Sequence, residues 1–367
     1  MNLTKPAQRN EGIDILICVA AFFVVCLHEW FLGEFGLYVH SVARFAVPVF
    51  LMITGYFYEG VVRRGREAAQ IKKMSLLFLG ANFLYFITEL LTSLAAGRLG
   101  DFFSDCFSVK SMTVFLLLNE SPFAGHLWYL GATLYALLLI SLLRRLTANW
   151  KMILYIISPI FIICSLALTK YSVLLWGREL VPEPYYLRNF LFTGLPYFSI
   201  GLFLSEHKSA AEKLGNKQAV CLGFVLLFAA TTVFEYFILK RTGLYADGEI
   251  YLSTTFFAVA LFVMLSSPFW NTKKLSLVKK IGRDYSAMIY IIHILITKAA
   301  KALFIRLHIF PIYNAAAPII IFALSVAFSA VYYLIREKLT GRKKHRKKSL
   351  PNIRLRLKKT ARPKACR

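Results

Sequence analysis

Long apolar stretches dominate the pattern of hydrophobic and polar positions in this chain. Stretches of about 17 to 22 residues recur along it, with short polar segments between them. A helix of that length crosses the roughly 30 Å hydrocarbon layer of a bilayer, where only helices and closed barrels satisfy the backbone. The short alternating segments of a barrel do not occur. We therefore predict helical spans at residues 13–31, 38–58, 74–95, 127–143, 152–169, 190–205, 219–239, 252–269, 286–306 and 315–335.

The Lys and Arg residues outside these spans are divided unequally between the two sides. The N-terminus, every second loop after it and the C-terminal tail hold 33 of them, whereas the remaining loops hold 7. The positive-inside rule places the richer set in the cytoplasm. The expected fold is thus an all-α integral membrane protein, a polytopic bundle of about ten transmembrane helices with both termini cytoplasmic. Its expected location is the cell (plasma) membrane.

Composition supports this class, and charge divides the chain into two parts. Hydrophobic residues make up 58% of it, against about 45–50% in soluble domains. The formal net charge is +25, yet residues 336–367 alone hold 15 Lys and Arg and one acid. We expect a membrane domain at 1–335 and a basic cytoplasmic tail at 336–367 that binds anionic membrane lipids. Charge concentrated in so short a tail does not indicate a nucleic-acid partner.

The six cysteines are scattered and form neither a CxxC motif nor a cluster with histidine. This spacing predicts no disulfide framework. It also predicts no metal site, because structural zinc sites need paired ligands at short spacing.

His28 is the leading candidate for chemistry. It lies near the expected outer end of the first span, where a polar side chain is costly and therefore a functional candidate. Its ordinary pKa suits a general base that takes a proton from a hydroxyl; the alternative is a hydrogen-bonded structural histidine. Glu29 follows directly, but neighbouring helical residues point about 100° apart. Glu29 therefore either tunes the imidazole or faces another helix.

Other polar residues in the spans are weaker candidates. Arg44, in the second span, is expected to face the same cavity and to pair with Glu29 or with an anionic ligand, because a guanidinium in lipid needs a partner. In a reaction it would position an anionic group or stabilise the oxyanion of a tetrahedral intermediate. Asp14, Ser286 and His293 are further buried polar candidates, with a hydrogen-bonded structural role as the alternative for His293.

Three basic residues of the ninth span, Lys298, Lys301 and Arg306, fall toward one of its ends. Long basic side chains at such positions extend to the membrane interface. We therefore interpret them as interfacial anchors. Glu89 and Glu235 fit an interfacial cap and a functional carboxylate equally well.

Four stretches together resemble the membrane acyltransferase-3 family, most closely its shorter branch of surface-glycan O-acetyltransferases. They keep the family order over about residues 9–335. The stretches are EGIDILICVAAFFVVCLHE (11–29), ARFAVPVFLMITGYFYEG (43–60), HLWYLGATLYALLL (126–139) and IGRDYSAMIYIIHIL (281–295).

The resemblance implies a ten-helix membrane acyltransferase. Such a protein takes an acyl group, usually acetyl, from cytoplasmic acyl-CoA and passes it to a hydroxyl of an extracytoplasmic glycan or lipid-linked sugar. The family's first-helix histidine falls on His28, its second-helix arginine on Arg44 and its late histidine on His293.

The chain departs from the family pattern at two places. Many members carry a basic residue eleven positions before the first-helix histidine, where this chain has Ile17. Members often place an Arg-x-x-Arg motif just before the third helix; Arg63 and Arg66 give that spacing early in the loop, and Lys72–Lys73 stand nearer the helix. We expect CoA phosphates to be bound by Arg9 or by this basic loop.

The leading hypothesis is therefore a membrane O-acyltransferase, and two others stay open. A transporter or flippase of a small polar or lipid-linked solute would use the same buried charges, although the sequence shows no internal repeat. A non-catalytic membrane module would explain Ile17. Similar modules in certain serine racemases precede a soluble racemase domain, and the roughly 32 residues after the last span are too few for such a core.

Overall fold

The computed structural model describes residues 10–181, 183–246, 248–272 and 274–340. Helices are the only regular elements in these ranges, and η3 and η5 are single π-helical turns. The elements are α1 (Glu11–His28), α2 (Gly33–Ala43), α3 (Ala46–Arg63), α4 (Glu67–Ala95), α5 (Leu99–Cys106), α6 (Val109–Leu118), η1 (Gly125–Leu127), α7 (Trp128–Leu146), α8 (Trp150–Leu168), α9 (Ser172–Trp176), η2 (Pro184–Tyr186), η3 (Phe190–Gly194), α10 (Leu195–Glu206), α11 (Lys208–Gly215), α12 (Gln218–Arg241), α13 (Leu252–Ser266), η4 (Pro268–Trp270), α14 (Ser276–Lys280), η5 (Ile281–Tyr285), α15 (Ser286–Arg306) and α16 (Phe310–Thr340).

The helices confirm the membrane class predicted from the apolar stretches. Eight helical segments among the described residues are long and apolar enough to cross a bilayer. Two further apolar segments fall where the sixth and eighth spans are expected, but Phe190–Glu206 and Leu252–Ser266 are shorter. A count of ten spans and cytoplasmic termini stay predictions. Arg9 and residues 341–367 of the basic tail lie outside the described residues.

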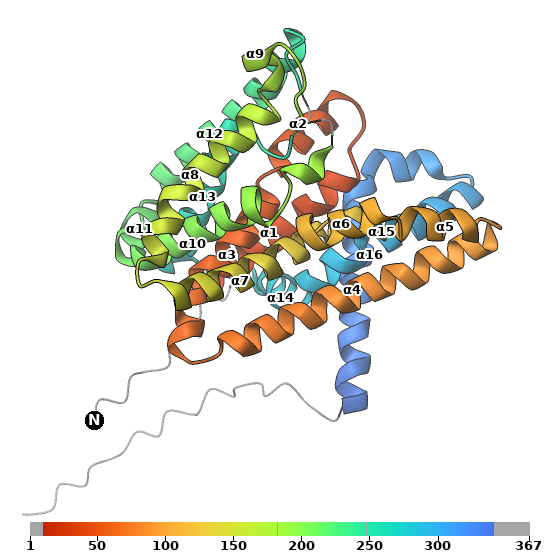
Figure 1. Cartoon of the computed structure of the whole chain (residues 1–367), viewed down its shortest axis with the longest axis horizontal. Helices are drawn as coiled ribbons and strands as arrows, with labels where there is room; N and C mark the ends of the chain where they lie inside the picture. Colours follow the sequence, from red (N-terminus) through yellow and green to blue (C-terminus); the bar gives the residue numbers. More distant parts are fainter. Residues whose placement is uncertain (1–9, 182, 247, 273, 341–367) are drawn as a thin grey trace, which may run out of the picture.

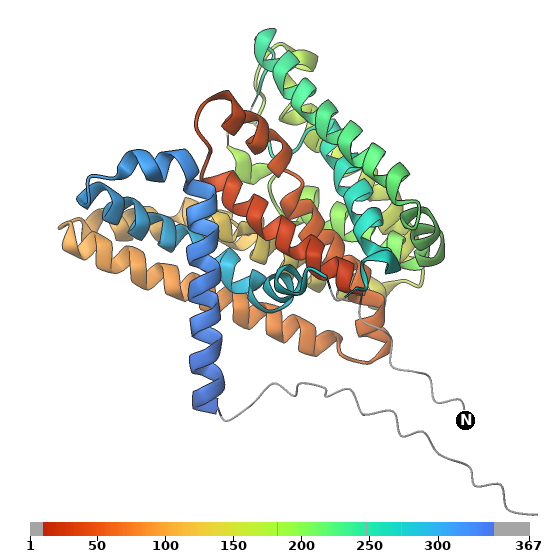
Figure 2. The same ribbon diagram turned by 180° about the vertical axis from the view of Figure 1, so that it is seen from behind.

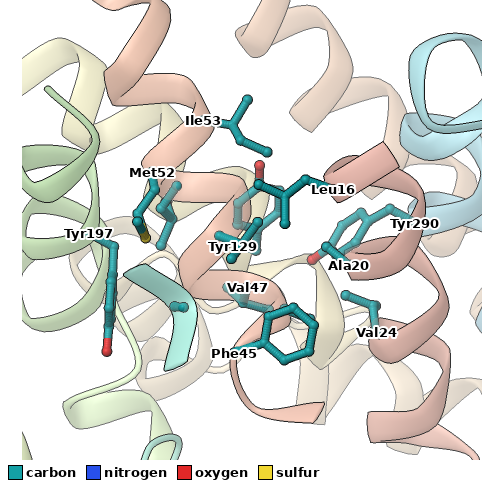
Figure 3. Close-up of a cluster of buried hydrophobic side chains, with 14 of the residues drawn as sticks. Leu16, Ala20, Val24, Phe45, Val47, Met52, Ile53, Tyr129, Tyr197 and Tyr290 are labelled. Atoms are coloured by element: carbon teal, nitrogen blue, oxygen red, sulfur yellow. The ribbon is translucent and has the colours of Figure 1, made fainter. Parts of the chain in front are cut away.

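The centre of the bundle is an apolar core between α1, α3, α7 and α10. Figure 3 shows Leu16, Ala20 and Val24 of α1 beside side chains of α3, with Tyr129 of α7 among them. Leu16 and Ala20 are completely buried. Since lipid is as apolar as these side chains, close packing rather than escape from water holds such helices together.

Small residues allow one especially close helix pair. A Cβ atom on Gly55 of α3 would stand 1.9 Å from the carbonyl oxygen of Phe198 in α10, and one on Gly201 of α10 would stand 1.9 Å from that of Met52. No side chain fits at such distances. The glycines therefore fix α3 and α10 in backbone contact, and this is the most extensive helix–helix contact between the described elements.

A break in the second predicted span lies beside Arg44. Residues 38–58 were expected to be continuous, but α2 ends at Ala43 and α3 begins at Ala46. Pro48 explains the break, because proline has no N–H to donate to the carbonyl four residues earlier, which is that of Arg44. Arg44 thus stands at a bend between two helices.

The periphery consists of helices that expose apolar side chains. On α4, Leu76, Leu79 and Phe83 are 63%, 60% and 65% exposed, a row that a water-soluble surface rarely tolerates but lipid accepts. Figures 1 and 2 show α4 along one edge and the C-terminal half of α16 projecting beyond the other helices. A non-helical residue, Ala316, kinks α16 two residues before Pro318.

Candidate active site

His28 is the last residue of α1 and lines an open cavity of about 340 Å³. The side chain is exposed to this cavity, although α1 itself is largely buried. At the other end of α1, the side chain of Asn10 accepts hydrogen bonds from the backbone N–H groups of Gly12 and Ile13 and caps the helix. The cavity is lined by His28, Tyr85, Glu89, Phe123, Ala124, Gly125, His126, Arg188, Ile294 and Lys298.

Three histidines from distant parts of the chain meet here. The ring of His28 lies 5.1 Å from that of His293 on α15 and 6.0 Å from that of His126 on η1, centroid to centroid. The rings of His126 and His293 are 5.2 Å apart. Both are buried, whereas His28 is exposed. The geometry thus brings together His28 and His293, which the sequence indicated separately, and adds His126.

The hydrogen bonds of His293 define its role in this cluster. Its Nδ1 atom lies 2.8 Å from the carbonyl oxygen of Tyr290 and 3.2 Å from that of Ile289. Carbonyl oxygens only accept, so we assign the proton of a neutral ring to Nδ1, which leaves Nε2 as an acceptor. The Nε2 atoms of His126 and His293 are buried and make no hydrogen bond within the described chain.

Arg188 connects this cavity to a second one of about 210 Å³, which we call the polar cavity. Its guanidinium lies 2.9 Å from the carboxylate of Glu120 and 3.5 Å from that of Glu249, and packs over the ring of Trp128. The second cavity is lined by Arg44, Ser165, Thr169, Val181, Pro184, Leu187, Arg188, Gly248 and Glu249.

Arg44 lines the second cavity and pairs with Glu249 at 3.6 Å. Burial alone raises the pKa of Glu249, but the guanidinium groups of Arg188 and Arg44 outweigh it, so the net pKa is lowered. Burial raises the pKa of Glu120, and Arg188 only partly opposes this. The carboxylate of Glu249, which Arg44 and Arg188 share, is therefore held ionised.

A pH dependence follows from the lowered pKa of Glu249. A carboxyl whose pKa is lower in the folded state stabilises the fold above its unfolded pKa, about 4.3, and this contribution is lost as the pH falls through the folded value. We expect Glu249→Gln to lower the melting temperature at pH 7 and the difference from wild type to narrow below pH 4. Thermal unfolding in detergent between pH 7 and pH values below 4 measures this difference in melting temperature, with Glu183→Gln at an exposed position as the control. A pH-independent difference would contradict it.

Glu29 is placed away from Arg44. Its buried carboxylate accepts hydrogen bonds from Lys301 at 2.8 Å and from Tyr313 at 2.9 Å, and so joins the end of α1 to α15 and α16. The expected pairing of Arg44 with Glu29 is not formed, because Glu29 faces these helices and Glu249 occupies the guanidinium. Glu29 contacts neither His126 nor His293 by a hydrogen bond in the described chain.

The other predicted polar candidates lie apart from the histidines. Asp14 is buried on α1, fourteen residues before His28 and thus about 21 Å away along the helix. Its backbone oxygen lies against Gly282 of η5 so closely that a Cβ there would be 1.9 Å away. Ser286 is half-buried at the start of α15. No group of three metal-ligating side chains is arranged to hold an ion within the described ranges.

The basic loop expected to bind the donor lies at the far end of α3. Arg63, Arg66 and Lys72–Lys73 are exposed around the α3–α4 turn. Since α3 has 18 residues, this turn is about 27 Å along the helix from the bend at Arg44. Arg9 lies outside the described residues. The predicted donor and acceptor regions are thus at opposite ends of the bundle.

Four residues of the site were missed by sequence reasoning: His126, Arg188, Glu120 and Glu249. For His126 a signal existed, since a histidine stands at the start of the HLWYL stretch. The other three lie in loops, where charged residues are common, and nothing in their local sequence indicates that they meet.

Comparisons with known proteins agree with this architecture. The sequence model of an acyltransferase domain, that of the acyltransferase-3 family, matches residues 10–334. A protein of Enterococcus faecalis named "Amino-acid racemase" is 27% identical over 315 residues. That match covers 79% of this chain but 41% of the relative, so the chain spans about two fifths of that protein's length. No solved structure gives a significant match.

The family match covers nearly the whole described bundle, including the three histidines and both arginines of the site. This chain therefore belongs to the acyltransferase-3 family of membrane proteins.

Proposed function

We propose that this protein transfers an acyl group, in the first instance acetyl, from cytoplasmic acyl-CoA to a hydroxyl of an extracytoplasmic glycan or lipid-linked sugar. The observation that carries the proposal is the position of His28. It is exposed in an open cavity that His126 and Arg188 also line, and the buried ring of His293 lies 5.1 Å from its own. A base and a cation converge there at the end of a buried helix. Acyl transfer to a hydroxyl needs these groups.

In the proposed reaction His28 is the general base. Its imidazole takes the proton of the acceptor hydroxyl while the oxygen attacks the thioester carbonyl carbon. The tetrahedral intermediate then collapses, the carbon–sulfur bond breaks, and the imidazolium returns the proton to the departing sulfur as free CoA thiol. Atoms and charges balance without a metal or a redox partner. His126 and His293, whose rings lie 6.0 Å and 5.1 Å from that of His28, orient the His28 ring, and the Nε2 of His293 is left as a hydrogen-bond acceptor.

The negative charge of the intermediate requires a donor. Arg188 lines the same cavity as His28, so we assign it the oxyanion role, which is typically worth about 10²–10³ in rate for one donor. Arg44, in the adjoining cavity, positions the acceptor. Glu29 keeps a supporting role here: its bonds to Lys301 and Tyr313 fix the end of α1 on which His28 stands.

The basic loop between α3 and α4 is proposed to bind the CoA phosphates. Replacing Arg63, Arg64, Arg66, Lys72 and Lys73 with glutamine is expected to raise the KM for acyl-CoA at least about tenfold, because each lost charged hydrogen bond costs roughly 1.5–3 kcal/mol. Steady-state CoA release measures it. The same change at Lys208, Lys213 and Lys217, in another loop expected to be cytoplasmic, is the control. An unchanged KM would remove the loop from the donor site.

The proposed activity is tested by CoA release from acetyl-CoA in proteoliposomes supplied with extracted envelope glycans. Acyl transfer predicts thiol release and acetylated glycan in equal amounts. Vesicles that accumulate a labelled polar solute without acetyl-CoA, and release no CoA, would instead identify a transporter. A protein that does neither would be a non-catalytic membrane module, the reading that Ile17 favours.

A further inference from the structure

A third cavity opens between α9, α12 and α13 and differs sharply from the histidine site. It has a volume of about 440 Å³, and its walls are almost wholly apolar. Its one acid, Glu235, accepts hydrogen bonds from the backbone of Leu252 at 2.8 Å and from the hydroxyl of Ser253 at 2.6 Å. We call this the apolar cleft; it is lined by Tyr171, Leu174, Phe228, Thr231, Phe234, Glu235, Ile238, Leu239, Leu252, Ser253 and Phe256.

The apolar cleft adjoins the polar cavity of Arg44 and Arg188. Two segments of the chain line both cavities. In the first segment Thr169 lines the polar cavity and Tyr171 lines the cleft; in the second, Glu249 lines the polar cavity and Leu252 lines the cleft. The hydroxyl of Tyr171 lies 3.3 Å from the backbone nitrogen of Leu252, so the two segments touch at the boundary. A molecule at this boundary reaches hydrocarbon on one side and charge on the other.

Two arginines of the polar cavity keep hydrogen-bonding capacity beyond their ion pairs, because the Nε atom of Arg44 and that of Arg188 are buried and have no hydrogen-bond partner among the described residues. Arg44 and Arg188 share Glu249, and Arg188 also pairs with Glu120. Each guanidinium offers five N–H donors, so both retain capacity for a further acceptor. An anionic group fits this cavity, and a phosphate matches the planar fork of arginine.

We propose that the cleft and the polar cavity together bind a lipid whose headgroup carries a phosphate, with its hydrocarbon chain in the cleft and its phosphate at Arg44 and Arg188. This inference rests on the proposed function and makes it more specific, because it identifies the acceptor of the acyl group as lipid-linked. A water-soluble glycan would leave the cleft without a use. A sugar beyond the phosphate reaches His28 past Arg188, which lines both polar cavities.

The surroundings of the cleft determine which part of such a lipid gives selectivity. A hydrocarbon chain gains little by leaving the bilayer for an apolar cleft, because both environments are equally apolar. The phosphate must therefore supply most of the preference. Loss of one charged contact corresponds to about tenfold in binding or more, and the proposal predicts a phosphate dependence of that size.

The test uses geranylgeranyl phosphate with a diazirine at the chain terminus, added to the protein in phosphatidylcholine nanodiscs. After irradiation, labelled peptides are identified by mass spectrometry. We expect labels in the peptides of α9, α12 and α13, at least about tenfold more than with the matching alcohol. Equal labelling by the phosphate and the alcohol, or labels spread over other lipid-facing helices, would overturn the proposal.

Matched variants locate each end of the lipid. Leu174 lines the cleft and neighbouring Leu175 does not, although they are 51% and 56% exposed. Leu174→Trp is expected to lower labelling at least about fivefold, and Leu175→Trp to leave it unchanged. Arg44→Gln should abolish the preference for the phosphate over the alcohol while labelling by the alcohol persists. Equal effects of the two tryptophans would contradict the cleft, and an undiminished preference would contradict the phosphate site.

Labelling and acyl transfer can fail separately. CoA release that depends on His28 without phosphate-dependent labelling would leave the acyltransferase standing and exclude the lipid acceptor. Labelling without CoA release would leave the lipid site standing and overturn the acyltransferase.

Discussion

Replacing His28 with alanine is expected to lower acyl transfer by a factor of about 10²–10⁴, the usual contribution of a general base. The side chain is exposed to the cavity at the end of α1, so its removal leaves no unfilled core, and the melting temperature should change little. Stopped-time measurement of CoA thiol in proteoliposomes gives the rate. The loss should appear in kcat, because the base acts on the reacting hydroxyl rather than on binding.

His207→Ala is the matched control, since His207 is an exposed histidine at the end of α10, remote in sequence from the cluster. It should keep the wild-type rate. A His28→Ala protein that is folded and retains the wild-type rate would exclude His28 as the base. His126 would then be the histidine to examine next.

Replacing Arg188 with glutamine is expected to affect both rate and stability. The change removes the proposed oxyanion donor, at a cost of about 10²–10³ in kcat. It also leaves the largely buried Glu120, 2.9 Å from the guanidinium, without its cation, which typically costs about 3 kcal/mol when a buried pair loses one member. Thermal unfolding and CoA release separate these two effects.

The double variant Arg188→Gln/Glu120→Gln distinguishes catalysis from folding. It removes the uncompensated carboxylate, so most of the stability should return while kcat stays low. Arg178→Gln, an exposed arginine of the same loop, should change neither quantity. If kcat recovers together with stability, Arg188 holds the loop in place and does not stabilise the reacting oxygen.

The positions of most long helices along the chain could be predicted from the sequence because lipid imposes one simple requirement. An apolar run must be long enough to cross the hydrocarbon, and its ends follow from the first charges. The ninth predicted span, residues 286–306, has the same ends as α15. The bend at Arg44 was missed, although Pro48 carries the signal, because apolar character alone does not report a missing N–H donor.

The candidate site was predicted only where it lies on spans. His28, Arg44 and His293 lie in apolar stretches of sequence. Because placing a polar side chain in lipid costs free energy, such residues are recognised as functional candidates from the sequence alone. Arg188 and Glu249 come from loops 61 residues apart, and their meeting depends on tertiary packing that no local pattern encodes. Lys301, interpreted as an interfacial anchor, instead pairs with Glu29, 272 residues away.

The contact between α3 and α10 has a consequence for the energetics of an empty site. Arg44 lies two residues before α3 begins. Arg188 lies two residues before the π-helical turn η3, which leads into α10. Because Gly55 and Gly201 lock the two backbones together and Glu249 pairs with both guanidiniums, the two arginines keep their places when nothing is bound. An arriving anion therefore meets donors already in place, and its binding costs little reorganisation free energy.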